Sequence, residues 1–196
     1  ISIQRKISPL TDLIAVIKLT WFLAVNKFQI VHAHTPKGGL VGMMSSYLAR
    51  VPNRIYTIHG LPLETASGLK RKLLWLTERV SCMLATKVLT VSRSLKKKVV
   101  EEKIYPDEKL HILAEGTACG LDLKRFSKKE TSEKNRIEIR SKFNIKANDI
   151  LIGFAGRLTE DKGISTLINS FLRISKDFNN VYLFVLGELD FDRGGL

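Results

Sequence analysis

The sequence is poor in cysteine, the residue that ties together small secreted domains and many metal sites. Its 196 residues hold two cysteines, Cys82 in a helical pattern and Cys119 in a loop-like segment, with no CxxC motif. A disulfide framework or a zinc knuckle needs more cysteines than this. The composition therefore favours a reducing, cytoplasmic compartment.

A long, unbroken hydrophobic run is also missing. The most apolar window, LTDLIAVIKLTWFLAV, is interrupted by Asp12 and Lys18 and is shorter than the roughly 20 residues that cross a bilayer. It predicts an amphipathic helix rather than an anchor, and we expect no signal peptide before it. Because the chain starts on Ile1 and its last ten residues, GELDFDRGGL, follow a strand-like run without closing a fold, we expect a fragment of a longer protein.

Acidic residues are scarce: 19 Asp and Glu face 32 Lys and Arg, for a formal net charge of +13. The excess lies in residues 1–110, with 18 basic against 7 acidic residues, whereas residues 111–196 hold 14 against 12. Nucleic acid, an anionic membrane surface or a phosphorylated substrate would each suit this asymmetry.

The segment GLKRKLLWLTERVSCML contains a dense cluster of basic residues. Lys70, Arg71 and Lys72 crowd the first turn of its expected helix, where cations oppose the helix dipole. Trp75 is a residue type that settles at membrane interfaces. At helical spacing the segment also carries Leu69, Leu73, Leu76 and Val80. We expect peripheral docking at the inner face of the plasma membrane, with a core-facing stripe and a solvated basic face as the alternative.

Apolar runs of strand length alternate with helical patterns. The expected strands are QIVHAH, RIYTIH, KVLTV, KLHIL, ILIGFA and VYLFVLG, and the expected helices lie near 10–26, 38–50, 69–85, 93–103, 136–143 and 164–177. This βαβα order predicts an α/β fold with Rossmann-like parallel sheets covered on both faces. A polar segment over 114–135 lacks a core period and predicts a linker between a domain at 1–113 and a second at 136–196.

Ligands of such sheets bind at the carboxyl ends of the strands. VHAHT places His32 and His34 two residues apart, so both rings point to the same face. The pair could bind a metal, serve the structure, or hydrogen-bond a substrate; with four histidines in the chain and His111 on a separate strand, the metal is the least favoured reading. His59 follows the next strand and is the best single site candidate, with a loop-capping role as its alternative.

Two glycine-containing loops could bind an anion. TPKGGLVG lacks the GxxxxGK[ST] spacing of a phosphate loop, so Gly38 and Gly39 are expected to let a helix start tightly against the sheet, or to offer backbone N–H groups to an acceptor. In GFAGRLTEDKG, Gly156 and Arg157 follow a strand and Lys162 precedes a helix. Two cations and a helix N-terminus suit a pyrophosphate better than a solvated turn.

In order and spacing, these motifs resemble the retaining glycosyltransferases of family four. The resemblance covers essentially the whole chain. Members of that family have the GT-B fold, in which two Rossmann-like domains face each other across a cleft. The segments that carry it are QIVHAHT, YTIHG, VLTVS, EGTACGLDLKRF and FAGRLTEDKG. The ending VLGELDFDRGGL is similar to enzymes that extend lipid-linked oligosaccharides for bacterial surface polysaccharides.

The resemblance implies roles for particular residues. Arg157 and Lys162, with Gly156, would bind the diphosphate of a nucleotide-sugar, and His59 would lie at the reaction centre. His34 and the two glycines after it would lie on the acceptor side. The family's glycine-rich loop would precede residue 1 and its paired glutamates would follow Leu196, so we expect these 196 residues to be inactive alone.

The resulting hypothesis is a metal-independent hexosyltransferase with no cofactor. It would transfer a sugar with retention of configuration from a nucleotide-sugar to a lipid-linked or surface-polysaccharide precursor. The alternative is a non-catalytic binder of nucleic acid or anionic surfaces on a Rossmann-like scaffold. Base stacking needs aromatic residues among the cations, and the clusters LKRKLLW and SLKKKVV offer only Trp75, so we expect no nucleic acid partner.

Overall fold

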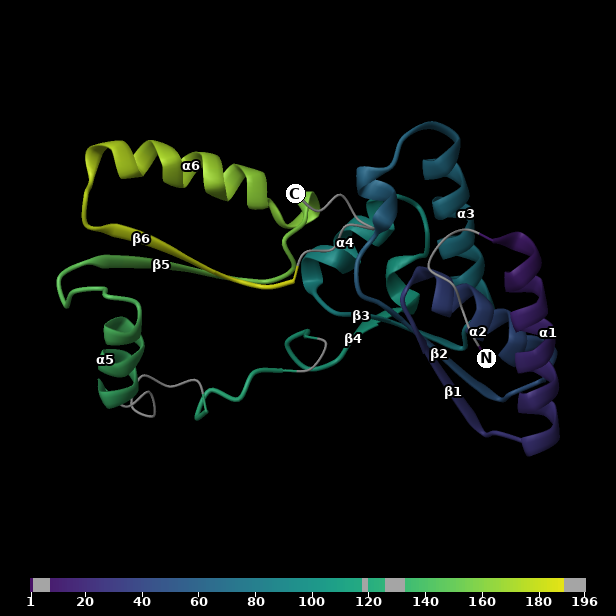
Figure 1. Cartoon of the computed structure of the whole chain (residues 1–196). Helices are drawn as coiled ribbons and strands as arrows, with labels where there is room; N and C mark the ends of the chain where they lie inside the picture. Colours follow the sequence, from purple (N-terminus) through teal and green to yellow (C-terminus); the bar gives the residue numbers. More distant parts are fainter. Residues whose placement is uncertain (2–7, 118–119, 126–132, 189–196) are drawn as a thin grey trace. The chain divides into compact units, whose positions relative to one another are not determined.

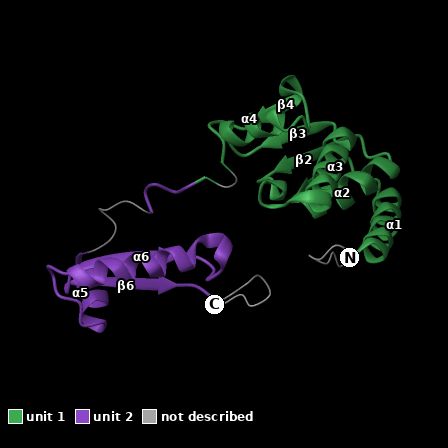
Figure 2. Ribbon diagram, turned by 90° about the horizontal axis from the view of Figure 1, so that it is seen from above, with its two compact units in different colours: residues 1–120 green, residues 121–196 purple. Residues whose placement is uncertain are grey.

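The computed structural model describes residues 1, 8–117, 120–125 and 133–188 (Figure 1). They belong to two compact units, residues 1–120 and residues 121–196 (Figure 2). The linker predicted over 114–135 lies partly outside the described residues, as does Cys119. The predicted domain limits therefore stay predictions.

The first unit is built on a four-stranded parallel sheet with the strand order β1-β2-β3-β4. Its strands are β1 (Ile30–His34), β2 (Asn53–Ile58), β3 (Lys87–Thr90) and β4 (Leu110–Ile112). Its helices are α1 (Pro9–Asn26), α2 (Pro36–Leu48), α3 (Gly68–Leu84) and α4 (Arg93–Glu101), with the short 3-10 helices η1 (Pro62–Thr65) and η2 (Asp107–Lys109). The α/β class and the parallel sheet predicted from the sequence are confirmed.

The helices that connect these strands cover one face of the sheet. Tyr56, Val88 and Leu110 are partners across β2, β3 and β4 and therefore point to the same side. They share one buried core with Met43 of α2 and Val99 of α4. Because the strand order never reverses, right-handed crossovers leave every connecting helix on this side. For the described residues of the first unit, the expectation of helices on both faces is wrong.

A buried acid lies inside this core. Glu78 of α3 is 2% exposed, and its Oε1 accepts a hydrogen bond of 2.7 Å from the hydroxyl of Tyr56. Burial raises the pKa of Glu78 to about 7, against the opposing effect of this hydrogen bond. Burial and the nearby Glu78 also raise the pKa of the Cys82 thiol. The hydrogen bond satisfies a group that would be costly to bury unpaired.

Helix α1 packs on α2. Ala15 and Val16 form a small core with Val41, and an ion pair of 2.8 Å joins Asp12 Oδ1 to Lys37 Nζ. Helix α1 also has the length and apolar composition of a membrane span, and its side away from α2 exposes Ile17 and Trp21, so the amphipathic helix predicted from the sequence stays a prediction.

The second unit contains a two-stranded parallel sheet. Its elements are α5 (Glu133–Lys142), β5 (Ile150–Ala155), η3 (Glu160–Lys162), α6 (Ile164–Asp177) and β6 (Val181–Leu186). The strands pair along their full length, and the ring of Phe143 meets that of Phe184 edge-on, with centroids 4.9 Å apart. The bounds of β5 and α6 are those predicted from the sequence.

Candidate active site

His34 and His59 meet at the carboxyl edge of the first sheet. His34 ends β1 opposite Thr57 of β2, and His59 is the first residue after β2. Their Nδ1 and Nε2 atoms are 2.9 Å apart, so one imidazole donates a hydrogen bond to the other. Both rings lie in the exposed part of the site. The two histidines singled out from the sequence are thus brought together by adjacent parallel strands.

His32 has a different environment. Its ring stacks near that of His34, with centroids 4.1 Å apart, which agrees with the shared face expected from HxH spacing. Its Nε2 shares a hydrogen bond of 2.8 Å with Thr57 Oγ1. Burial, followed by the neighbouring His34 and His59, lowers the pKa of His32. The hydrogen bond to Thr57 ties His32 to the neighbouring strand β2.

The described residues contain no group of three His, Cys, Asp or Glu side chains arranged to hold a metal ion. The remaining histidine, His111, lies on β4, which β2 and β3 separate from β1 in the sheet. His34 contacts both of the other rings, and His32 shares a hydrogen bond with Thr57, so the observed interactions of the cluster are ring contacts and hydrogen bonds.

The turn from β1 into α2 is strained. Thr35 has φ 66° and ψ 154°, a combination that is almost confined to glycine and is tolerated mainly where the surroundings enforce it. It directly follows His34 and caps α2, where Pro36 occupies the first turn. Strain of this kind gathers at binding sites, and nothing in the residue pattern signalled it.

The two glycines of this turn have packing roles. A Cβ on Gly39 would lie 2.2 Å from Cε2 of the Tyr56 ring, and one on Gly38 would lie 3.1 Å from Thr35 Oγ1. Gly39 thus lets α2 begin against the sheet, as the sequence suggested. An acceptor-binding role for either glycine remains a prediction.

The second candidate site is the loop between β5 and α6. Gly156 follows β5 and its N–H donates to Leu186 O at 2.9 Å. Arg157 comes next, 3.9 Å from Asp161 Oδ2. Lys162 ends η3, and Gly163, with φ 72°, caps α6. Both cations therefore lie within the one loop that opens α6, a 14-residue helix whose N-terminus favours anions.

Sequence reasoning missed the acid in this loop that pairs with the arginine. Asp161 stands at i+4 from Arg157, a spacing that could have suggested the pair. It also accepts a hydrogen bond from Thr159, which is fully buried. The loop is therefore held by its own side chains, and a ligand diphosphate would compete with Asp161 for the guanidinium.

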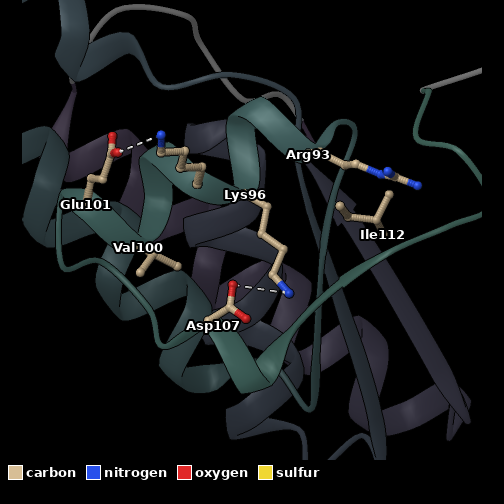
Figure 3. A pocket seen from close by; sticks show the side chains of 7 residues that line it. Arg93, Lys96, Val100, Glu101, Asp107 and Ile112 are labelled. Atoms are coloured by element: carbon tan, nitrogen blue, oxygen red, sulfur yellow. Dashed lines mark ion pairs between the residues drawn. The ribbon is translucent and has the colours of Figure 1, made fainter.

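A separate hollow lies on the first unit between α4, η2 and β4 (Figure 3). Its cations are neutralised: Lys96 Nζ is 3.2 Å from Asp107 Oδ1, and Lys97 Nζ is 3.7 Å from Glu101 Oε1. These pairs favour an ordinary solvated surface over an anion site.

Comparison with known proteins defines the class. The family model described as Glycosyltransferase Family 4 matches residues 3–119. This match covers more than half of the chain, which therefore belongs to that family.

Two curated relatives are similar over most of the chain. The capsular polysaccharide biosynthesis glycosyltransferase CapM of Staphylococcus aureus is 35% identical over 191 residues, 97% of this chain and 49% of CapM. The UDP-Gal:alpha-D-GlcNAc-diphosphoundecaprenol alpha-1,3-galactosyltransferase of Escherichia coli is 27% identical over 160 residues, 81% of this chain and 39% of that enzyme. The chain spans about half the length, or less, of these relatives.

A solved structure supports the fold. Anabaena Alr3699/HepE, in complex with UDP-glucose, matches with a TM-score of 0.69 and 21% identity, over 92% of this chain and 45% of that protein. The Rossmann-like parallel sheets of GT-B type predicted from the sequence are confirmed by this likeness.

Proposed function

We propose that the protein carrying this chain transfers a hexose from a nucleotide-sugar to an acceptor with retention of configuration. The observation that carries the proposal is the hydrogen-bonded pair of His34 and His59 at the carboxyl edge of the first sheet, in a chain that belongs to a glycosyltransferase family. The carboxyl edge is where ligands of parallel α/β sheets bind.

The charged loop of the second unit would serve the leaving group. When the bond between the sugar and the diphosphate breaks, negative charge accumulates on the diphosphate. Arg157, Lys162 and the N-terminus of α6 can stabilise that charge without moving a proton. These groups would perform the task that a metal ion performs in other phosphate chemistry, so the proposal includes no metal and no cofactor.

His59 would position the donor sugar or the acceptor hydroxyl. Its exposed ring can hydrogen-bond a sugar, and His34 fixes its orientation from the next strand. A ring held by a neighbour loses less freedom when it binds a ligand, which favours a defined pose.

The names of the similar proteins support the substrate classes. HepE binds UDP-glucose, the Escherichia coli relative acts on a diphosphoundecaprenol-linked sugar, and CapM serves capsular polysaccharide biosynthesis. We therefore propose a nucleotide-sugar donor and a lipid-linked or surface-polysaccharide precursor as acceptor. The low cysteine content of the sequence supports the further proposal of a cytoplasmic site of action.

The test is sugar transfer by the complete protein, because the curated relatives are about twice the length of this chain or more. Arg157→Ala or Lys162→Ala should reduce transfer about a hundredfold, the usual effect of removing one preorganised charge-stabilising group. Lys176→Ala, in the last turn of the same helix, is the matched control and should retain activity.

Folding of each variant is checked by its urea midpoint. Near wild-type transfer by both folded loop variants would contradict the diphosphate role. A product with inverted anomeric configuration, measured by NMR coupling constants, would contradict retention.

A further inference from the structure

Helix α3 carries apolar side chains on two sides: Leu74, Trp75 and Cys82 belong to the core side, and a second apolar row faces outward. Glu78 and Ser81, on the buried side, are 2% and 0% exposed. The opposite side carries the α3 outer stripe, which we define as Leu69, Leu73, Leu76 and Met83 and which is 84%, 42%, 51% and 65% exposed. Glu78 accepts a hydrogen bond from the Tyr56 hydroxyl, and Ser81 donates one to the Thr77 carbonyl of its own helix, whereas the four side chains of the stripe are exposed among the described residues.

The stripe is one continuous surface. At 100° per residue, its members recur at i, i+4, i+7 and i+14 and so project in nearly the same direction along the helix. A row of exposed aliphatic side chains of this length is a common mark of an interaction surface. The core-facing stripe considered as the alternative from the sequence is therefore wrong for Leu69, Leu73 and Leu76, whereas Val80 is half-buried.

Two lysines border the stripe. Lys70 and Lys72 are exposed on either side of it in the first turn of α3, and that turn contains no acid. Within the described part of the chain, neither lysine forms an ion pair. They are two of the 18 basic residues that outnumber 7 acidic residues in 1–110.

The other members of the sequence cluster have internal partners. Arg71 donates to both carboxylate oxygens of Glu102 at 2.7 Å, and Trp75 Nε1 donates to the carbonyl of Glu102 at 2.8 Å. Arg71 is thus compensated within the protein, and the expectation that Trp75 is a membrane-interface residue is wrong. Both residues join α3 to the end of α4.

We propose that the α3 outer stripe, with Lys70 and Lys72 at its borders, docks the protein on an anionic lipid bilayer. The aliphatic row suits the acyl boundary, and the bordering ammonium groups suit lipid phosphates. A second copy of the chain fits less well, because a symmetric interface would bring the same lysines together. This surface is independent of the proposed sugar transfer.

The test is co-sedimentation of the purified chain with vesicles of phosphatidylcholine, alone or with about 30 mol % phosphatidylglycerol. Binding should require the anionic lipid. It should fall steeply as salt rises from about 0.05 to about 0.5 M, because exposed charges are then screened.

Two variants address the two parts of the surface. Leu69→Ser/Leu73→Ser removes half of the stripe, and Lys70→Glu/Lys72→Glu reverses its border. Each should lower the partition coefficient about tenfold or more, since every cation and every buried aliphatic group contributes severalfold. Arg71 is left unchanged because it supports the packing of α3 on α4.

Matched controls lie elsewhere on the first unit. Leu10→Ser/Leu13→Ser alters the exposed apolar side of α1, where the two leucines are 78% and 56% exposed. Lys18→Glu/Arg50→Glu makes the same charge change at other exposed positions. Both controls should bind within about twofold of the wild type, because neither touches α3.

Several results would overturn the proposal. Equal binding to neutral and anionic vesicles would contradict the role of the lysine charges. Wild-type binding by either α3 variant would contradict docking through the α3 outer stripe. Equal losses in the controls would indicate diffuse attraction or docking through α1. A stripe variant that changes only the oligomeric state, measured by light scattering, would assign the stripe to a second copy. If a double variant fails to fold, Leu69→Ser alone serves, since Leu69 is 84% exposed.

Discussion

Replacing Glu78 by glutamine should change how the stability of the first unit depends on pH. The carboxyl has a pKa of about 7 in the folded protein, against 4.5 as its ordinary value. Between these two values the folded state holds a proton that the unfolded state lacks. The stability that Glu78 contributes is therefore fully present below pH 4.5 and is lost as pH rises through about 7.

The magnitude follows from the shift. A difference of one pKa unit corresponds to about 1.4 kcal/mol, so a carboxyl shifted from 4.5 to about 7 makes the wild type about 3 kcal/mol less stable at pH 8 than at pH 4, for this group alone. Glutamine is neutral at every pH and keeps an oxygen that can accept the hydrogen bond from Tyr56. We expect Glu78→Gln to lack this slope and to be the more stable protein at pH 8, by about 1–3 kcal/mol.

Urea unfolding at pH 5, 6, 7 and 8, followed by tryptophan fluorescence, measures the effect. Both tryptophans, Trp21 and Trp75, lie in the first unit, so the signal reports that unit alone. Glu115→Gln is the control, because Glu115 has a side chain that is 91% exposed and its variant should run parallel to the wild type. Parallel profiles for Glu78→Gln and wild type, or a less stable variant at pH 8, would refute the reasoning.

Three further outcomes are expected. Gly39→Ala should lower the free energy of unfolding by about 1–3 kcal/mol, because the new Cβ would overlap the Tyr56 ring; Gly60→Ala, with nothing within 4 Å of its Cβ, should change the urea midpoint little. In the complete protein, His34→Ala should lower the transfer rate about five- to tenfold, the value of about one hydrogen bond, whereas His34→Asn, which can place a polar atom near the lost Nδ1, should recover most of it. Cys82, buried and with a raised pKa, should react with iodoacetamide much more slowly in the native protein than in urea, as followed by mass spectrometry.

Much of the architecture could be predicted because its signals are local. The apolar run ILIGFA and the periodic segment after Gly163 predicted β5 and α6 at the bounds observed. Alternation of strands and helices also predicted the parallel sheet, and the ends of its strands predicted where His34 and His59 lie. Each of these inferences needs only neighbours in the sequence and the rule that parallel strands end at one edge.

The site was predictable in position but not in its contacts. The sequence placed Arg157 and Lys162 in the loop before α6, yet the ion pair with Asp161 and the strained φ of Thr35 appeared only in the structure. A loop's side-chain partners depend on its backbone path, which composition does not specify.

What the sequence by itself determined is which residues of α3 share a face; which face is buried was decided by tertiary structure. Helical spacing groups Leu69 with Leu73 whatever surrounds them. The core received the other side of α3, with Cys82 and Trp75, and it accommodates Glu78 there because the Tyr56 hydroxyl donates a hydrogen bond to the buried carboxyl. The strand order of the first sheet also runs in one direction without reversal, which places α2, α3 and α4 on one side of it. Burial depends on partners that are distant in sequence, so periodicity alone could not select the face.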